Sequence, residues 1–152
     1  MSAARRDRSP LVFLDSNVIF SGLHSPEGPP GDILRYLIEG KTTVVVSQQV
    51  LEEVVRTFKK KLPRALPALR EFLLNSPLKV VGDPEPDEVA RWAGVMQEGD
   101  ASILAAAIAA GPDFFVTGDS HFLNNTQLEK ESTMAICSPS ELIDNLSLEE
   151  IT

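Results

Sequence analysis

Three short apolar runs constrain the fold of this chain most strongly. LVFL (11–14), TVVV (43–46) and FFVT (114–117) are each as long as a strand and do not alternate apolar with polar residues. That pattern is typical of strands covered on both faces, as in a parallel sheet. LKVV (78–81) and TMAI (133–136) are weaker candidates for two further strands. A parallel sheet between two layers of helices is therefore expected.

Segments with helical spacing separate these runs. The expected helices cover residues 31–40, 47–63, 65–77, 87–96, 100–111 and 138–146. Ser47 is expected to cap the helix that follows TVVV, because a serine hydroxyl accepts a hydrogen bond from the first helical turn. Strands that alternate with helices of this length need crossover connections and pair in parallel. We predict a three-layer α/β/α fold with a mostly parallel sheet of four or five strands.

The composition is that of one globular domain. The chain has 152 residues, of which 43% are hydrophobic and 24% charged, and its single cysteine excludes an internal disulfide. No apolar run approaches the ~20 residues of a membrane span. We expect a cytoplasmic protein without a membrane partner. The expected domain covers residues 11–146, with a flexible tail at 1–10 and another at 147–152.

The net charge of −8 is unevenly distributed. Residues 1–79 hold 12 Lys and Arg against 8 Asp and Glu, whereas residues 80–152 hold 2 against 14. A basic run, which stands out in the first half, is either a solvated helix face or an arm that contacts phosphates. The candidates for contact with an RNA backbone are Arg56, Lys59, Lys60, Lys61 and Arg64.

Acidic residues fall where a parallel sheet binds its ligands, beyond the carboxyl ends of the strands. Asp15 follows LVFL and Asp119 follows FFVT, while Asp100 opens the helix before FFVT and Glu53 lies in the helix after TVVV. Taken singly, each has a simpler interpretation as a helix cap, an exposed helix residue or a turn residue. Together they predict one acidic pocket, which would need cations to offset the repulsion. Oxygen ligands favour Mg²⁺ or Mn²⁺, ions that polarise phosphodiesters and activate water.

Four stretches together resemble the PIN domain family over about residues 11–146. They are VFLDSNVIFSGL, SQQVLEEV, GDASILAAAIAAG and FFVTGDSHFL. The resemblance implies an endoribonuclease dependent on Mg²⁺ or Mn²⁺. It assigns catalytic roles to Asp15, Glu53, Asp100 and Asp119, with metal held by Asp15, Asp100 and Asp119. Glu52 stays open as an alternative to Glu53. The family pattern also implies supporting roles for Asn17, Ser47 and Thr117.

The resemblance further implies partners. They are a single-stranded RNA substrate, an antitoxin or other inhibitory protein if the chain is the toxin of a toxin–antitoxin pair, and a second copy in a homodimer. Residues 59–79 are longer and more basic than the corresponding part of compact toxins, which leaves the toxin role open. The alternative is a PIN-like module that binds RNA or protein without cleaving. A phosphoryl-transfer domain fits less well, because VFLDSN lacks the second aspartate that a haloacid-type phosphatase carries.

Overall fold

The computed structural model describes residues 9–151 of the chain, with side chains through residue 147. The tail predicted at residues 1–10 therefore lies almost wholly outside the described residues, as does the last residue of the tail predicted at 147–152. No helix in the described part is long and apolar enough to cross a membrane.

Five parallel strands form one sheet in the order β3-β2-β1-β4-β5. The strands are β1 (Leu11–Leu14), β2 (Thr43–Ser47), β3 (Lys79–Val81), β4 (Phe114–Val116) and β5 (Ala135–Cys137). All five predicted runs contribute a strand, within two residues of the expected bounds. The central strand β1 is deeply buried, since Val12, Phe13 and Leu14 are fully enclosed.

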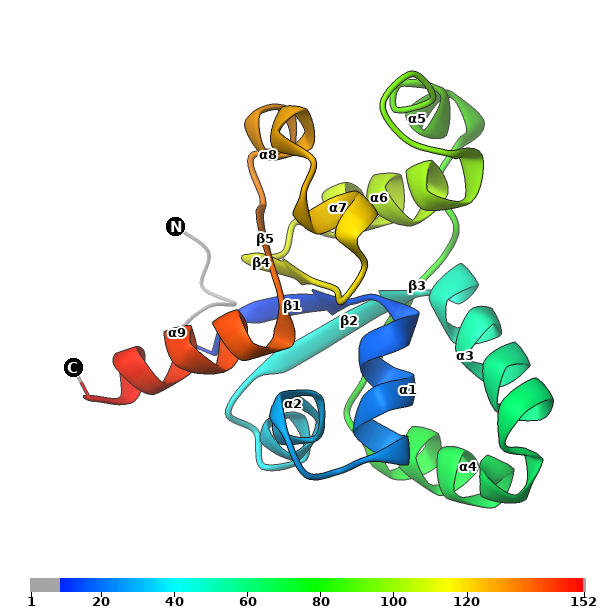
Figure 1. The fold of residues 1–152 in the computed structure, drawn as a ribbon, viewed down its shortest axis with the longest axis vertical. Helices are drawn as coiled ribbons and strands as arrows, with labels where there is room; N and C mark the ends of the chain where they lie inside the picture. Colours follow the sequence, from blue (N-terminus) through cyan, green and yellow to red (C-terminus); the bar gives the residue numbers. More distant parts are fainter. Residues whose placement is uncertain (1–8, 152) are drawn as a thin grey trace.

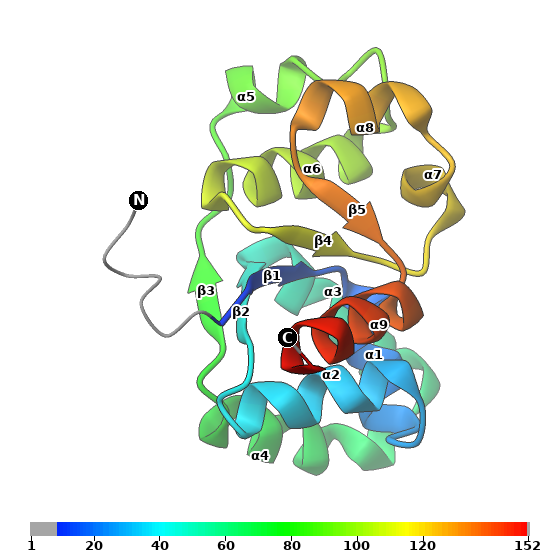
Figure 2. The same cartoon turned by 90° about the vertical axis from the view of Figure 1, so that its left-hand side faces the viewer.

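Helices cover both faces of this sheet (Figures 1 and 2). They are α1 (Ser16–His24), α2 (Pro29–Ile38), α3 (Gln48–Lys61), α4 (Leu66–Asn75), α5 (Pro86–Ala90), α6 (Glu98–Ala110), α7 (Ser120–Leu123), α8 (Thr126–Ser132) and α9 (Pro139–Ile151), with a 3-10 turn at Pro63–Ala65. Helices α1, α2, α4 and α9 lie on one side, and α5, α6 and α8 lie on the other. The predicted three-layer α/β/α fold is confirmed.

The helix expected over 87–96 is shorter than predicted. Helix α5 ends at Ala90, and the chain continues in turns. There the amide of Trp92 donates to the carbonyl of Val89, and that of Val95 to Trp92, each at 3.0 Å. These bonds reach three residues back instead of four, the tighter spacing of 3-10 turns. Trp92 and Met96 are both buried by this path, so tertiary packing overrides the helical periodicity.

The strand order determines where a ligand can bind. From β1 the chain builds β2 and β3 on one side, then adds β4 and β5 on the other side of β1. Such a reversal leaves a crevice beyond the carboxyl ends of the two strands where it occurs. Here those strands are β1 and β4, and the residues that follow them are Asp15 and the segment Thr117–Asp119.

Candidate functional site

Asp15 is a buried carboxylate at the end of β1. Only 4% of its surface is exposed, although it carries an ionisable group. Its Oδ1 accepts a hydrogen bond from the backbone amide of Ser16 at 2.8 Å, so Asp15 caps α1. The capping interpretation from the sequence thus describes a real contact. It accounts for one carboxylate oxygen only.

The other oxygen of Asp15 is held by two side chains. Oδ2 accepts from Thr117 Oγ1 at 2.8 Å and from Asn17 Nδ2 at 3.0 Å. Asn17 Oδ1 in turn accepts from the amide of Gly118 at 2.8 Å, and Thr117 Oγ1 accepts from the amide of Asp119 at 3.0 Å. This network ties the end of β1 to the end of β4. It fixes the orientation of Asp15 and the path of the chain into Asp119.

Glu53 reaches the same edge of the sheet from α3. Its Oε1 accepts from Ser16 Oγ at 2.9 Å, next to Asp15 in the sequence. On the other side Gln49 Nε2 lies 3.4 Å from Glu53 Oε2 and donates to the carbonyl of Gly99 at 3.1 Å. Glu53 therefore lies between the segment of Asp15 and the start of α6, where Asp100 is found.

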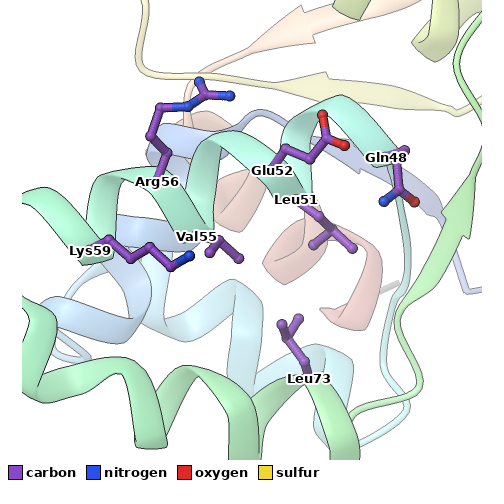
Figure 3. A pocket seen from close by; sticks show the side chains of 7 residues that line it. All are labelled: Gln48, Leu51, Glu52, Val55, Arg56, Lys59 and Leu73. Atoms are coloured by element: carbon purple, nitrogen blue, oxygen red, sulfur yellow. The ribbon is translucent and has the colours of Figure 1, made fainter.

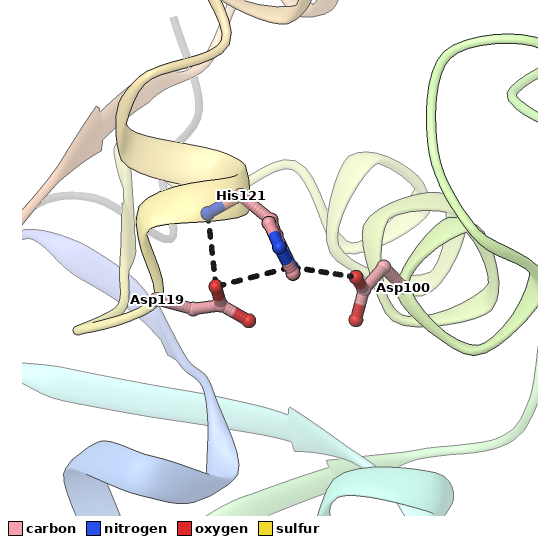
Figure 4. A group of neighbouring side chains, drawn as sticks. All are labelled: Asp100, Asp119 and His121. Atoms are coloured by element: carbon pink, nitrogen blue, oxygen red, sulfur yellow. Dashed lines mark hydrogen bonds and ion pairs between the residues drawn. The ribbon is translucent and has the colours of Figure 1, made fainter.

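Asp100 and Asp119 face each other across His121 (Figure 4). Nδ1 of His121 is 3.5 Å from Asp119 Oδ1 and 3.9 Å from Asp100 Oδ2. Asp119 also accepts from the backbone amide of His121 at 2.9 Å, which makes it the cap of the one-turn helix α7. One ligand atom of each of these three residues lies within 4.8 Å of the others.

The carboxylates of this site repel one another. Burial raises the pKa of Asp15 above its ordinary value, and the charges of Glu53 and Asp119 raise it further, against hydrogen bonds from Thr117 and Ser16 that lower it. Burial is also the largest cause of a raised pKa at Asp100, followed by Asp119, with a smaller contribution from Glu53 and an opposing one from His121. Each of the two aspartates therefore interacts with the same two neighbours, so the four acids form one electrostatic cluster.

The donor set of this cluster fits a hard divalent cation. It offers carboxylate oxygens from four segments, and the mutual repulsion that raises the pKa values is what a bound cation would offset. Mg²⁺ and Mn²⁺ bind through carboxylates and keep open positions for water and phosphate. Among the described residues, Asp100, Asp119 and His121 have ligand atoms within 4.8 Å of one another. Asp15 interacts with Glu53 and Asp119 through its charge.

The model of the PIN domain family matches residues 11–121, a span that contains all four acids. The chain belongs to the PIN domain family. No curated protein matches it.

Solved structures are similar to this PIN domain over most of their length. PAE2754 from Pyrobaculum aerophilum is 19% identical with a TM-score of 0.66, over 91% of this chain and 90% of that one. VapBC2 from Rickettsia felis, bound to a DNA fragment from their promoter, is 16% identical with a TM-score of 0.61, over 84% of this chain and 98% of that one. FitAcB from Neisseria gonorrhoeae is 20% identical with a TM-score of 0.59, over 84% of this chain and 97% of that one. At these identities the likeness concerns the fold.

The predicted supporting residues of this PIN domain are Asn17, Ser47 and Thr117. Asn17 and Thr117 bond Asp15 directly, as described above. Ser47 is fully buried and caps α3, its Oγ accepting from the amide of Val50 at 3.3 Å. It therefore positions the helix that carries Glu53. The prediction of Ser47 as a helix cap is confirmed.

Neither His121 nor Gln49 is among the site residues predicted from the sequence. Gln49 links Glu53 to the start of α6, and its Oε1 accepts from Ser102 Oγ at 2.6 Å. The TGDSH stretch contains His121, but a histidine two residues past an aspartate carries no spacing that distinguishes a ligand from a loop residue. Only the fold of α7 turns it toward Asp100.

Glu52, Arg56 and Lys59 lie beside one another along α3 (Figure 3). Glu52, Arg56 and Lys59 line a cavity of about 480 Å³ whose other walls are Gln48, Leu51, Val55 and, from α4, Leu73. Arg56 and Lys59 make no ion pair with any residue that the structure describes. Two of the five predicted RNA-backbone candidates, Arg56 and Lys59, therefore share this cavity. Lys60, Lys61 and Arg64 are exposed toward the far end of α3 and just beyond it.

Proposed function

We propose that this PIN domain is an endoribonuclease that depends on Mg²⁺ or Mn²⁺. The observation that supports the proposal best is the acidic cluster at the carboxyl edge of the sheet, where Asp15 and Asp100 each have a pKa raised by burial and by neighbouring carboxylates. Assembling like charges costs free energy, and a binding site for cations explains why a fold retains such a cluster. Membership of the family supports the same conclusion.

The side chains have distinct roles in this proposal. Asp15, Asp100 and Asp119 would hold the divalent cation, which would supply activation of water and stabilisation of negative charge on the phosphate. Glu53, held by Ser16, orients the attacking water. Thr117 and Asn17 keep Asp15 in place, through the hydrogen bonds to its Oδ2. Arg56 and Lys59 lie on the adjacent face of α3 and contact the backbone of a single-stranded RNA.

The adjacent pair Glu52 and Glu53 gives a matched test of this proposal. Wild type is expected to cleave single-stranded RNA with Mg²⁺ or Mn²⁺ and to stop when EDTA is added. Glu53→Gln should lower the rate about a hundredfold, because misplacing a reacting group by about 1 Å can cost roughly 10²-fold. Glu52→Gln removes the same charge one position earlier, on the face that lines the α3–α4 cavity, and should keep the wild-type rate.

Cleavage is measured on a fluorescently labelled RNA, with thermal unfolding of each variant to establish that it is folded. Equal rates for Glu53→Gln and wild type would remove Glu53 from the site. Cleavage that persists in EDTA would contradict the metal dependence itself.

A toxin role with a neutralising partner is the finer part of the proposal. The resemblance to the family implies such a partner, and the structures of VapBC2 and FitAcB are similar to this chain. A partner that inserts a cationic side chain among Asp15, Asp100 and Asp119 would block metal binding and offset their repulsion. Overproduction should then slow the growth of a host cell, and overproduction of Asp100→Asn should not. Equal growth with both proteins would argue against a toxin.

A further inference from the structure

We propose that His121 is a further metal-binding residue of this site, which with Asp100 and Asp119 forms a mixed nitrogen and oxygen ligand set. This set should favour divalent transition-metal ions such as Mn²⁺ over Mg²⁺. The inference rests on the proposed function, since it takes the acidic cluster to be a metal site, and it adds a residue outside the four acids.

The ligand atoms have the spacing of groups that share one ion. Ligands of Mg²⁺ or Mn²⁺ lie roughly 2.1 Å from the metal, so neighbouring ligand atoms are about 3 Å apart and opposite ones about 4.2 Å. Nδ1 of His121 is 3.5 Å from Asp119 Oδ1 and 3.9 Å from Asp100 Oδ2. Both values fall within that range, and the three ligand atoms all lie within 4.8 Å of one another.

Packing of the next residue, Phe122, fixes the position of His121. Phe122 is 1% exposed, and its ring meets that of Phe115 in β4 edge-to-face, with centroids 4.9 Å apart. This contact fixes α7 against the sheet. The side chain of His121 is 67% exposed, so it has room to turn into solvent, yet it points between the two carboxylates (Figure 4). An exposed ion pair contributes little free energy and would not by itself explain that orientation.

The chemistry of the imidazole determines which ion binds more tightly. Mg²⁺ binds oxygen almost exclusively, whereas first-row transition ions also accept imidazole nitrogen. Adding a nitrogen to two carboxylates should therefore raise affinity for Mn²⁺ and leave affinity for Mg²⁺ nearly unchanged. Gln49 and Glu53, which face the same region, offer oxygen and amide groups and do not produce this selectivity.

The test compares metal binding by wild type and His121→Gln. His24→Gln is the matched control, because His24 is the other histidine of the chain and lies at the far end of α1 from Asp15. Mn²⁺ and Mg²⁺ affinities are measured by calorimetry on the full chain. Pulsed EPR of bound Mn²⁺ then reports whether a ¹⁴N nucleus is coordinated, a readout that does not involve RNA cleavage.

We expect a ¹⁴N coupling in wild type and His24→Gln that is lost in His121→Gln, with Mn²⁺ affinity lowered at least about tenfold and Mg²⁺ affinity within about twofold. A ¹⁴N coupling that survives in His121→Gln, or an equal loss for both ions, would overturn the inference and leave the nuclease proposal intact. If wild type binds neither ion, the metal site fails altogether, and the inference fails with it.

Discussion

Asp100→Asn is expected to lower RNA cleavage by roughly a hundredfold to a thousandfold and, without added metal, to make the folded protein more stable. The first effect follows because a metal ion stabilises several kcal/mol of charge in the transition state, and each ~1.4 kcal/mol is a factor of ten in rate. Asparagine keeps the shape of the side chain but weakens its hold on a cation. The two effects have opposite signs, so a loss of folding cannot account for the loss of activity.

The gain in stability has a definite pH dependence. The pKa of Asp100 is raised by burial and by Asp119, so the folded state binds the proton more tightly than the unfolded chain does. The metal-free wild type therefore loses stability as pH rises from the unfolded pKa, about 3.9, through the raised folded pKa. Asp100→Asn has no such loss. A first-turn acid in α6 gains ~0.3–1 kcal/mol from the helix dipole, but the raised pKa means that burial and repulsion outweigh this gain.

Thermal unfolding in EDTA between pH 4 and 8 measures this effect. The advantage of Asp100→Asn should grow with pH and should reverse when Mn²⁺ is added, because an ion that binds only the folded state stabilises the protein that binds it better. Asp87→Asn is the matched control, since Asp87 is a first-turn acid of α5 outside the cluster, and this variant should cleave RNA at the wild-type rate. Asp100→Asn that is less stable than wild type at pH 8 without metal would contradict the electrostatic account.

The sequence predicts the parallel sheet and places Asp15 and Asp119 at one edge of it. Runs such as LVFL and FFVT do not alternate, which requires cover on both faces, and the carboxyl ends of parallel strands meet at one edge. Asp15 and Asp119 follow two such runs directly, so their approach depends only on those strands lying close together. The sequence does not predict that β1 and β4 are neighbours in the sheet. The structure shows this pairing, which brings the two aspartates close together.

Other features depend on tertiary contacts that periodicity does not encode. Glu52 and Glu53 are one position apart on α3, and apolar residues flank both, so the pattern left either one facing the site. The contact between Glu53 and Ser16 distinguishes them. The four-residue helix α7 is too short to give a helical pattern, and the orientation of His121 depends on Phe122 packing against Phe115. Neither contact can be inferred from the spacing of residues along the chain.

The double variant Arg56→Gln/Lys59→Gln is expected to weaken binding of single-stranded RNA by roughly 25-fold at 0.1 M salt. Each cation that displaces a counterion from a single strand contributes about 0.7 to the slope of log affinity against log salt, which is about fivefold at 0.1 M relative to 1 M. The slope itself should fall by about 1.4. The reason to expect contact with RNA is that both side chains line one cavity and make no ion pair among the described residues.

Geometry adds a second reason. Arg56 and Lys59 are three and six residues beyond Glu53, which places them about 4.5 and 9 Å along the axis of α3 from the acid site. An RNA strand with one phosphate at the acidic cluster can therefore continue over the part of α3 that carries Arg56 and Lys59. Binding is measured with Asp100→Asn as background so that RNA is not cut. Lys79→Gln/Lys130→Gln removes two cations elsewhere and serves as control. An equal change of slope in both double variants would mean that RNA senses only net charge and that α3 has no special part in its path.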